Sequence, residues 1–191
     1  MNDLTAWSNR SGDEVVILRS WKMTDLDDLV RFANNRNIAG NLTDAFPHPY
    51  TESDGIAFLQ RFAEDAPPGA GESGIGRVFA IETDGQVCGS IGIFPGTDVH
   101  RKNAEVGYWL AEPFWGRGIM TEAVRRIIEF GFKNFDVNRI YARPFGTNKG
   151  SQRVLEKAGM KLEACLERAI FKNGAYMDEL IFAIHRSGDT P

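Results

Sequence analysis

The chain has 191 residues, long enough for one complete hydrophobic core, and we expect a single domain over residues 1–191 with its core at about residues 15–185. The 42% hydrophobic and 25% charged residues are ordinary for a soluble globular protein, and the net charge of -4 argues against a general nucleic-acid-binding surface. No apolar run is long enough to span a membrane, and residues 1–16 lack a signal-peptide pattern. The expected location is therefore the cytoplasm, without nucleic-acid or membrane partners.

The thiol and imidazole side chains suggest neither a disulfide framework nor a metal site. Cys88 and Cys165 are far apart and lie within apolar runs, so we expect buried thiols in a reducing compartment. His48, His100 and His185 are scattered without the spacing of metal ligands. We expect no metal cofactor.

The first third of the chain predicts one strand and two helices. The first ten or so residues are polar and are expected to be loosely held, whereas residues 15–19 form a short apolar run typical of a strand. Thr24 is a plausible N-cap for a helix with near-helical apolar spacing. Residues 41–53, with two prolines and two aromatics, predict a loop or a kinked link before a second helix from about Ser53 to Glu64.

The middle of the chain changes to a pattern of strands. Residues 64–76 are rich in Pro and Gly and predict a loop. The runs 77–82 and 86–94 flank an Asp-Gly pair, which is a hairpin-turn signal, and residues 103–110 predict a third strand of this group. Three antiparallel strands are therefore expected here.

The last third predicts a helix, a strand, a short helix and a hairpin. The first helix follows Gly118, with Ala123, Val124, Ile127 and Ile128 on its apolar face. The later elements are a strand at 138–145, a helix at 151–159 ending at Gly159, and strands at 164–171 and 175–185 around Asn173-Gly174. This order predicts a mixed α+β fold with helices against a mostly antiparallel sheet.

Gly116 and Gly118 surround an arginine between a predicted strand and a predicted helix. Helix N-termini bind phosphate groups, so a phosphate loop is one interpretation and a tight strand-to-helix turn is the other. The Gly-Lys-Ser/Thr ending of a nucleotide-binding P-loop is absent, as are the third glycine and the acidic residue of a dinucleotide-binding motif.

Two segments resemble the GNAT superfamily of acyl-CoA-dependent N-acetyltransferases. They are "GYWLAEPFWGRGIMTEAV", residues 107–124, and "NKGSQRVLEKAGM", residues 148–160. Trp115 and Met120 depart from the general superfamily pattern, but they suit the ribosomal-protein-alanine (RimJ/RimL-like) branch. The resemblance covers nearly the whole chain, and it implies a GNAT-type fold with acetyl-CoA as co-substrate.

The resemblance assigns coenzyme A contacts to the glycine loop and to the strand before it. The loop contacts would be Trp115, Gly116, Arg117, Gly118, Ile119, Met120 and Thr121. Arg117 is alternatively a solvent-facing arginine, and Thr121 alternatively only caps the helix. Backbone groups at Tyr108, Trp109 and Leu110 would contact the pantetheine arm, although both aromatics could equally be core residues. Asn148 matches the asparagine that binds this arm, and it could also cap a helix.

The chemistry implied is attack of an amine on a thioester, which needs a neutral amine and a stabilised thiolate. Glu105 interrupts an apolar strand and is the candidate base; alternatively its carboxylate pairs with a neighbouring arginine or points to solvent. Ser151 stands where the superfamily has a serine and could contact the thioester sulfur, or it is an ordinary first-turn serine. No tyrosine occurs between Ala142 and Gly174, where many members place an acid.

Phe46, Tyr50 and Tyr176 are the candidate acceptor-binding residues, unless these aromatics simply cover the core. The resemblance implies an acetyl-CoA-dependent N-acetyltransferase acting on a primary amine, either a protein N-terminus or a small molecule. A non-catalytic acyl-CoA-binding sensor or scaffold is the alternative. Homodimers are common in the superfamily, so a homodimer is one expected assembly.

Overall fold

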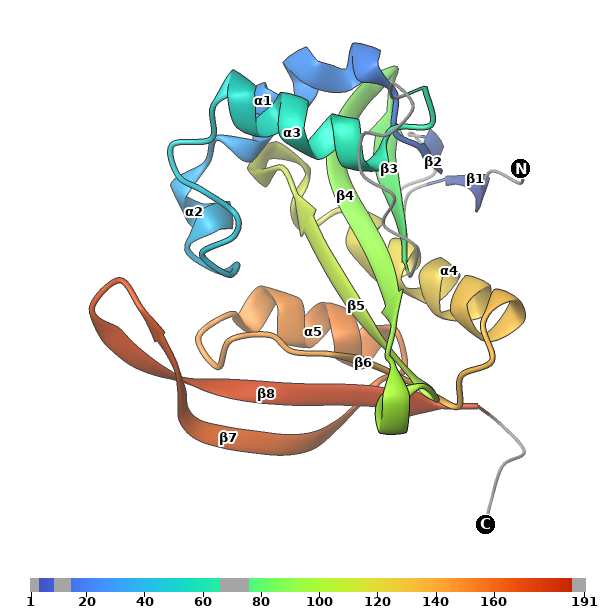
Figure 1. The fold of residues 1–191 in the computed structure, drawn as a ribbon, viewed down its shortest axis with the longest axis vertical. Coiled ribbons are helices and arrows are strands. Elements are labelled where there is room, and N and C mark those ends of the chain that lie inside the picture. Colours follow the sequence, from blue (N-terminus) through green and yellow to red (C-terminus); the bar gives the residue numbers. More distant parts are fainter. Residues whose placement is uncertain (1–3, 9–14, 66–75, 187–191) are drawn as a thin grey trace. The chain divides into compact units, whose positions relative to one another are not determined.

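The computed structural model describes residues 4–8, 15–65 and 76–186 (Figure 1), and the chain divides into two compact units. The first unit comprises Met1–Gly92 and Tyr108–Ile119, and the second comprises Ile93–Gly107 and Met120–Pro191. Nearly all of the loop expected at residues 64–76 lies outside the described residues. Strands β4 (Gln86–Pro95) and β5 (Asn103–Leu110) belong partly to each unit.

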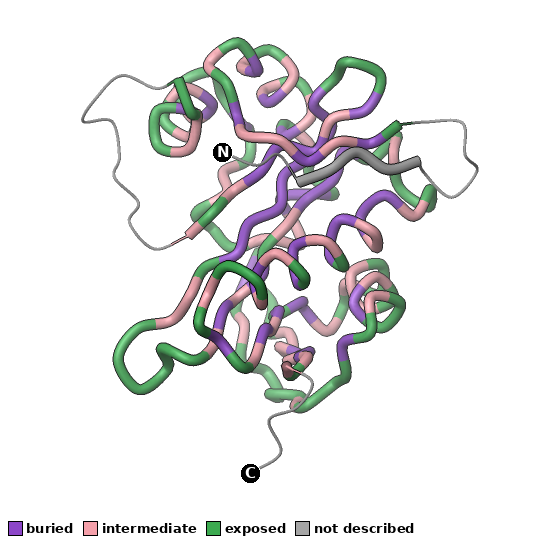
Figure 2. The backbone as a smooth tube through the Cα atoms, turned by 90° about the vertical axis from the view of Figure 1, so that its right-hand side faces the viewer, coloured by how far each residue is buried: buried purple, intermediate pink, exposed green. Residues whose placement is uncertain are grey.

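The strands of the first unit neighbour one another in the order β1-β2-β3-β4-β5. β1 (Leu4–Ser8) and β3 (Arg77–Thr83) each pair antiparallel with β2 (Val15–Ser20). For Leu4–Ser8, β1 corrects the expectation of a loosely held segment, because a short strand can be fixed by backbone pairing without an apolar run. Figure 2 shows how burial follows the strands, and in β4 every residue from Val87 to Ile93 is buried.

The helices of the first unit are α1 (Leu26–Ala33), α2 (Arg36–Ala39) and α3 (Glu52–Phe62). α1 and α3 pack closely, because a Cβ at Gly55 would come within 2.8 Å of a Leu26 methyl group. Their apolar faces join a core cluster of buried residues: Trp21, Leu29, Ala33, Ile38, Tyr50, Leu59, Ala80, Val87 and Trp109.

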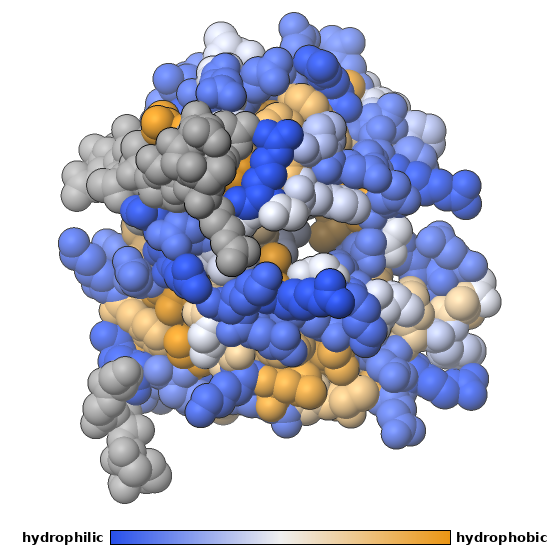
Figure 3. Space-filling model, turned by 180° about the vertical axis from the view of Figure 1, so that it is seen from behind, coloured by the Kyte–Doolittle hydropathy of each residue, from blue (hydrophilic) through white to orange (hydrophobic). Residues whose placement is uncertain are grey.

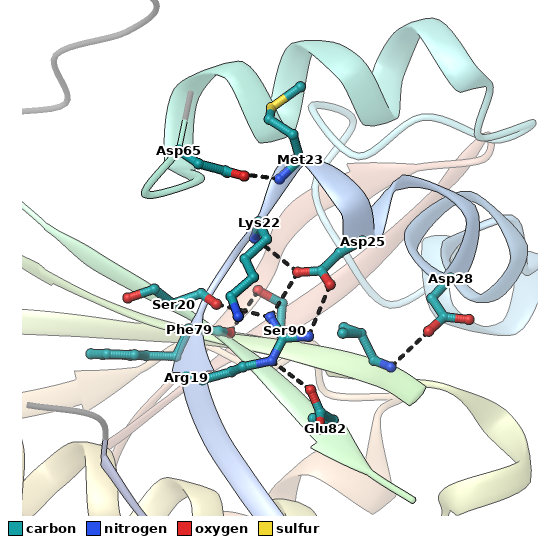
Figure 4. A network of polar contacts seen from close by, with 11 residues as sticks. Arg19, Ser20, Lys22, Met23, Asp25, Asp28, Asp65, Phe79, Glu82 and Ser90 are labelled. Atoms are coloured by element: carbon teal, nitrogen blue, oxygen red, sulfur yellow. Dashed lines mark hydrogen bonds and ion pairs between the residues drawn. The ribbon is translucent and has the colours of Figure 1, made fainter. Parts of the chain in front are cut away.

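The prediction that Thr24 is the N-cap of a helix is wrong. Thr24 lies inside a short 3-10 turn, η1 (Met23–Asp25), whose N-cap is Lys22. The capping group is the carboxylate of Asp25, which accepts a hydrogen bond from the Lys22 backbone N–H at 2.8 Å. Asp25 also accepts two hydrogen bonds from Arg19, and Arg19 contacts Glu82 as well (Figure 4). The network joins η1 to β2 and β3.

The strands of the second unit neighbour one another in the order β5-β6-β8-β7. β6 (Arg139–Ala142) runs parallel to β5, and β8 (Ala175–His185) pairs antiparallel with both β6 and β7 (Lys161–Lys172). The second unit also contains α5 (Lys149–Lys157), a 3-10 turn η2 (Asp98–His100) and nearly all of α4 (Ile119–Asn134). The expected apolar face of α4 is confirmed, since Ala123, Val124, Ile127 and Ile128 are all buried. The mixed α+β class with a mostly antiparallel sheet is confirmed.

The β7–β8 hairpin turns at Asn173 and Gly174, with φ angles of 54° and 78° that fit the expected tight turn. β7 is the last strand of its sheet, and most of its residues are exposed. The expectation of a buried thiol at Cys165 is therefore wrong, because an apolar run on an outer strand has no second layer to cover it. Exposed apolar side chains on this hairpin are Leu162, Leu166, Phe171 and Tyr176. Figure 3 shows apolar side chains reaching the surface low on the face drawn there.

None of the described helices is both long enough and apolar enough to cross a membrane.

Candidate active site

The glycine loop precedes α4 and takes a conformation that favours glycine. Gly116 and Gly118 have φ angles of 78° and 84°, in the left-handed region where a Cβ causes strain. A Cβ at Gly116 would meet no atom within 4 Å, so the space beside this residue is open. The loop leads into Ile119, the first residue of a helix of 16 residues. The first N–H groups of a helix have no acceptor within the helix, which makes this segment suited to binding an anion.

Two loop side chains fold back onto the segment before the glycines. The Trp115 indole Nε1 donates a hydrogen bond to the Leu110 carbonyl at 2.7 Å, although the ring is 47% exposed. The Arg117 guanidinium donates to the Pro113 carbonyl at 2.8 Å and lies over the Phe114 ring. Arg117 is thus held against the 3-10 turn η3 (Glu112–Phe114), and the backbone of the loop remains the part suited to phosphate.

A carboxylate just before the loop is held by two amides that were not singled out in the sequence. Glu112 accepts hydrogen bonds from the Asn35 side chain at 2.9 Å and from the Asn37 side chain at 3.1 Å. Both bonds lower the pKa of Glu112 below its ordinary value, and the bond from Asn35 has the larger effect. They tie α2 and its N-cap residue to the start of η3.

At the end of β5, Trp109 and Leu110 are buried and Tyr108 is half-buried. Trp109 belongs to the core cluster, and its carbonyl oxygen would lie 2.6 Å from a Cβ at Gly89. Gly89 therefore permits a close approach of the β4 and β5 backbones. For Trp109 the side chain has the core role, and only its backbone is a candidate for contact with coenzyme A.

Asn148 and Ser151 lie together at the start of α5. The Asn148 side-chain oxygen accepts a hydrogen bond from the Ser151 backbone N–H at 3.0 Å, so Asn148 is the N-cap of this helix. Ser151 is half-buried in the first turn. The capping role expected for Asn148 is confirmed, and its contact with the pantetheine arm stays a prediction.

Glu105 is surrounded by residues of the neighbouring strand. It pairs in register with Tyr141, whose hydroxyl donates to Glu105 Oε2 at 3.3 Å. Arg143, just beyond β6, donates to Glu105 Oε1 at 3.0 Å and to Oε2 at 3.2 Å. Burial, and next the charge of Glu105, raise the pKa of Tyr141 above its ordinary value, so the hydroxyl stays a donor. The alternative foreseen for Glu105, pairing with an arginine, is thus realised.

The candidate acceptor residues have different surroundings. Tyr50 is 5% exposed and packs against Phe46 with ring centroids 5.1 Å apart, and Phe46 also contacts Trp109. Burial is the main cause that raises the pKa of Tyr50 to about 12. Its burial favours a role in covering the core. Tyr176 is 59% exposed beside Phe171 on the β7–β8 hairpin, where a ligand could stack on it.

Sequence reasoning missed the polar partners of the site residues. Tyr141 and Arg143 lie two positions apart in the strand predicted at 138–145, and this spacing is the only sequence signal that their side chains share one face of the sheet. Among the described residues, no group of three or more His, Cys, Asp or Glu side chains could hold a metal ion.

The acetyltransferase (GNAT) domain family matches residues 16–161 of the chain. The probable N-acetyltransferase YjcK of Bacillus subtilis is 35% identical over 107 residues, which are 56% of this chain and 59% of that protein. The ribosomal-protein-serine acetyltransferase of Escherichia coli is 31% identical over 112 residues, 59% of this chain and 62% of that protein. These alignments cover less than two thirds of the relatives' own length.

Solved structures are similar over nearly the whole chain. RimJ of Mycobacterium smegmatis, in complex with CoA-disulfide, has a TM-score of 0.77 and 24% identity, and the alignment covers 97% of this chain and 90% of that one. The acetyltransferase (GNAT family) from Bacillus anthracis has a TM-score of 0.76 and 19% identity, with 96% and 98% coverage. At these identities the likeness establishes the fold, and it agrees with the one expected from the sequence.

Proposed function

The chain belongs to the acetyltransferase (GNAT) domain family, and from this premise we propose that it is an acetyl-CoA-dependent N-acetyltransferase acting on a primary amine. The observation that carries the proposal is the family match over residues 16–161, which includes the left-handed glycines before α4. Relatives named as N-acetyltransferases and structural neighbours determined with coenzyme A support it.

In this proposal the pyrophosphate of acetyl-CoA lies against the backbone from Gly116 to Ile119. The positive end of the helix dipole and the first N–H groups of α4 favour an anion there. Trp115, Met120 and Thr121 complete the loop, and Arg117 supplies positive charge from its place beside Phe114. Backbone groups of Tyr108, Trp109 and Leu110, together with Asn148, bind the pantetheine arm.

The reaction forms one bond and breaks one. The neutral amine nitrogen attacks the thioester carbonyl carbon, a C–N bond forms, and the C–S bond breaks to release the thiolate of coenzyme A. Glu105 accepts the proton that the amine loses, and Ser151 donates a hydrogen bond to the departing sulfur. Glu105 suits this role because it is ionisable, half-buried and held in place by hydrogen bonds.

The acceptor is a protein N-terminus or a small-molecule amine. A protein N-terminus is supported by the Escherichia coli relative, which is named a ribosomal-protein-serine acetyltransferase. The RimJ/RimL-like sequence of the glycine loop agrees with it. Phe46, Tyr50 and Tyr176 are the aromatic side chains proposed to contact the acceptor, with Tyr176 the most exposed of them.

The test combines acetyl-CoA titration calorimetry with an assay of thiol release from acetyl-CoA in the presence of peptides and small amines. The wild type should bind acetyl-CoA, and Gly118→Glu, which adds a strained side chain with a negative charge, should lose binding while remaining folded by circular dichroism. Glu105→Gln and Ser151→Ala should keep the affinity and lose turnover. A folded wild type that does not bind acetyl-CoA would contradict the proposal. Binding without turnover on any amine would instead favour a non-catalytic acyl-CoA-binding module.

A further inference from the structure

Of the two described residues that donate hydrogen bonds to the proposed base, Tyr141 and Arg143, Arg143 makes the shorter ones. Its Nε and Nη2 atoms donate to the two different oxygens of Glu105, at 3.0 and 3.2 Å. This two-point arrangement fixes the plane of the carboxylate, which a single lysine-type donor cannot do. The hydrogen bond with Glu105 is also the largest cause that raises the pKa of Arg143 above its ordinary value.

A second carboxylate holds Arg143 from another strand. Arg143 Nη1 lies 3.6 Å from Glu179 Oε1, and Glu179 belongs to β8. The backbone supports the same arrangement, because Phe145 forms an isolated bridge with Glu179, and the Leu180 N–H donates to the Pro144 carbonyl at 3.0 Å. The guanidinium therefore has anchors on both sides: Glu105 on β5 and Glu179 on β8.

Counting lone pairs identifies which oxygen of Glu105 can take a proton. Oε2 accepts from both the Tyr141 hydroxyl and Arg143 Nη2, whereas Oε1 accepts only from Arg143 Nε among the hydrogen bonds of Glu105 given above. Each carboxylate oxygen can accept about two hydrogen bonds. Oε1 thus has acceptor capacity to spare, and its direction is set by Arg143.

The exposure of these groups argues against a purely stabilising role. The side chains of Arg143 and Glu105 are 45% and 32% exposed, and ion pairs at this exposure contribute little to folding stability. Orientation of a reacting group has a much larger effect on rate, because a misplacement of about 1 Å can cost about 100-fold. The arrangement is therefore more useful for positioning than for folding.

We infer that Arg143 is a positioning residue for acetyl transfer, which keeps the Glu105 carboxylate in one orientation with Oε1 directed to the amine proton. The inference rests on the proposed function. Tyr141 assists from the same strand, and Glu179 holds Arg143 in turn.

The experiment compares Arg143→Gln and Arg143→Lys with the same changes at Arg125. Arg125 is a matched control because it pairs with Glu122 at nearly the same exposure, 49% and 31%, in the same unit of the chain. Steady-state kinetics with the best amine found in the thiol-release assay should give a kcat about 10- to 100-fold lower for Arg143→Gln, with the KM for acetyl-CoA unchanged. Arg143→Lys should recover part of the loss, since it restores the charge but not the two-point geometry. Both Arg125 variants should retain wild-type kcat.

The pH profile gives a readout that a structural role would not move. The charged and titratable groups around Glu105 are Arg143 and Tyr141 in direct contact, Glu179 through Arg143, and Arg139, whose guanidinium lies over the Tyr141 ring. Loss of the positive charge at Arg143 makes protonation of its partner easier, so the acidic limb of kcat/KM should move to higher pH in Arg143→Gln and less in Arg143→Lys.

The outcomes separate this inference from the proposed function. An inactive wild type would overturn the proposed function and, with it, the inference. An active wild type with unchanged kcat and pH profile in both Arg143 variants would overturn the inference alone. If Arg143→Gln fails to fold, Arg143→Lys decides, because a reduced kcat with a normal thermal unfolding curve supports positioning and a wild-type kcat contradicts it.

Discussion

At the scale of single residues, Gly116 offers a test of what its backbone requires. Its φ is 78°, and a Cβ there would meet no atom within 4 Å. Gly116→Ala therefore adds strain without a clash and should lower the free energy of unfolding by about 1–2 kcal/mol. Acetyl-CoA affinity should fall as well, because relief of the strain moves the loop N–H groups. Urea unfolding and calorimetry measure the two effects.

Gly107 is the matched control for this change. A Cβ at Gly107 also meets no atom within 4 Å, and its φ lies outside the positive range. Gly107→Ala should leave stability unchanged or slightly raised, since alanine restricts the unfolded chain. Equal stability and affinity in both alanine variants would contradict the left-handed requirement at Gly116.

The same residues show what a sequence can predict at this scale. Gly116 and Gly118 could be identified because a left-handed backbone is a local requirement that only glycine meets easily. The contacts of Glu105 could not, since Tyr141 and Arg143 are 36 and 38 positions away and meet it only through the register of two parallel strands. Their roles in catalysis, like that of Glu105, stay predictions.

At the scale of elements, the pair of Arg19 and Asp25 holds η1 and the start of α1 against β2. Their side chains are 16% and 8% exposed, and the hydrogen bond with Asp25 is the largest cause that raises the pKa of Arg19 above its ordinary value. In Asp25→Ala, Arg19 keeps Glu82 as a partner but loses two charge-assisted hydrogen bonds, and the Lys22 N–H loses its cap, so the variant should cost about 3 kcal/mol in urea unfolding.

An exposed ion pair provides the comparison for Asp25. Lys102 and Asp136 lie 2.6 Å apart, but their side chains are 51% and 90% exposed, so Asp136→Ala should leave the unfolding curve unchanged. Comparable losses in the two variants would show that the burial of the Arg19–Asp25 pair is not what matters.

Elements were predictable where their signals were local. The two turns at Asp84-Gly85 and Asn173-Gly174 have the positive φ angles expected of tight hairpins. Each turn lies between two strands, as the sequence predicts. β1 was not predicted because it is held by backbone pairing with β2 and has no apolar run of its own. The exposure of Cys165 was not predicted because the sequence of a strand does not reveal whether it lies at the edge of its sheet.

At the scale of the whole molecule, β4 and β5 are shared by the two compact units. The expectation of a single domain over residues 1–191 stays a prediction. The fold class was predictable because the order of helices and strands, with a glycine loop after the strand at 103–110, leaves few arrangements. The division of the chain into two units was not predictable from the sequence, because it depends on contacts between distant segments.

The stability of the whole molecule should fall at high pH because of Tyr50. Burial raises its pKa from 10.0 to about 12, so the hydroxyl keeps its proton to a higher pH in the folded protein than in the unfolded chain. This contribution to stability is complete below pH 10 and is lost as the pH rises through 12, by about 3 kcal/mol in all. Urea unfolding across this range should show a shallower alkaline decline in Tyr50→Phe than in the wild type. Tyr176→Phe, on an exposed ring, should follow the wild-type curve, and an equal effect from both variants would assign the decline to groups other than Tyr50.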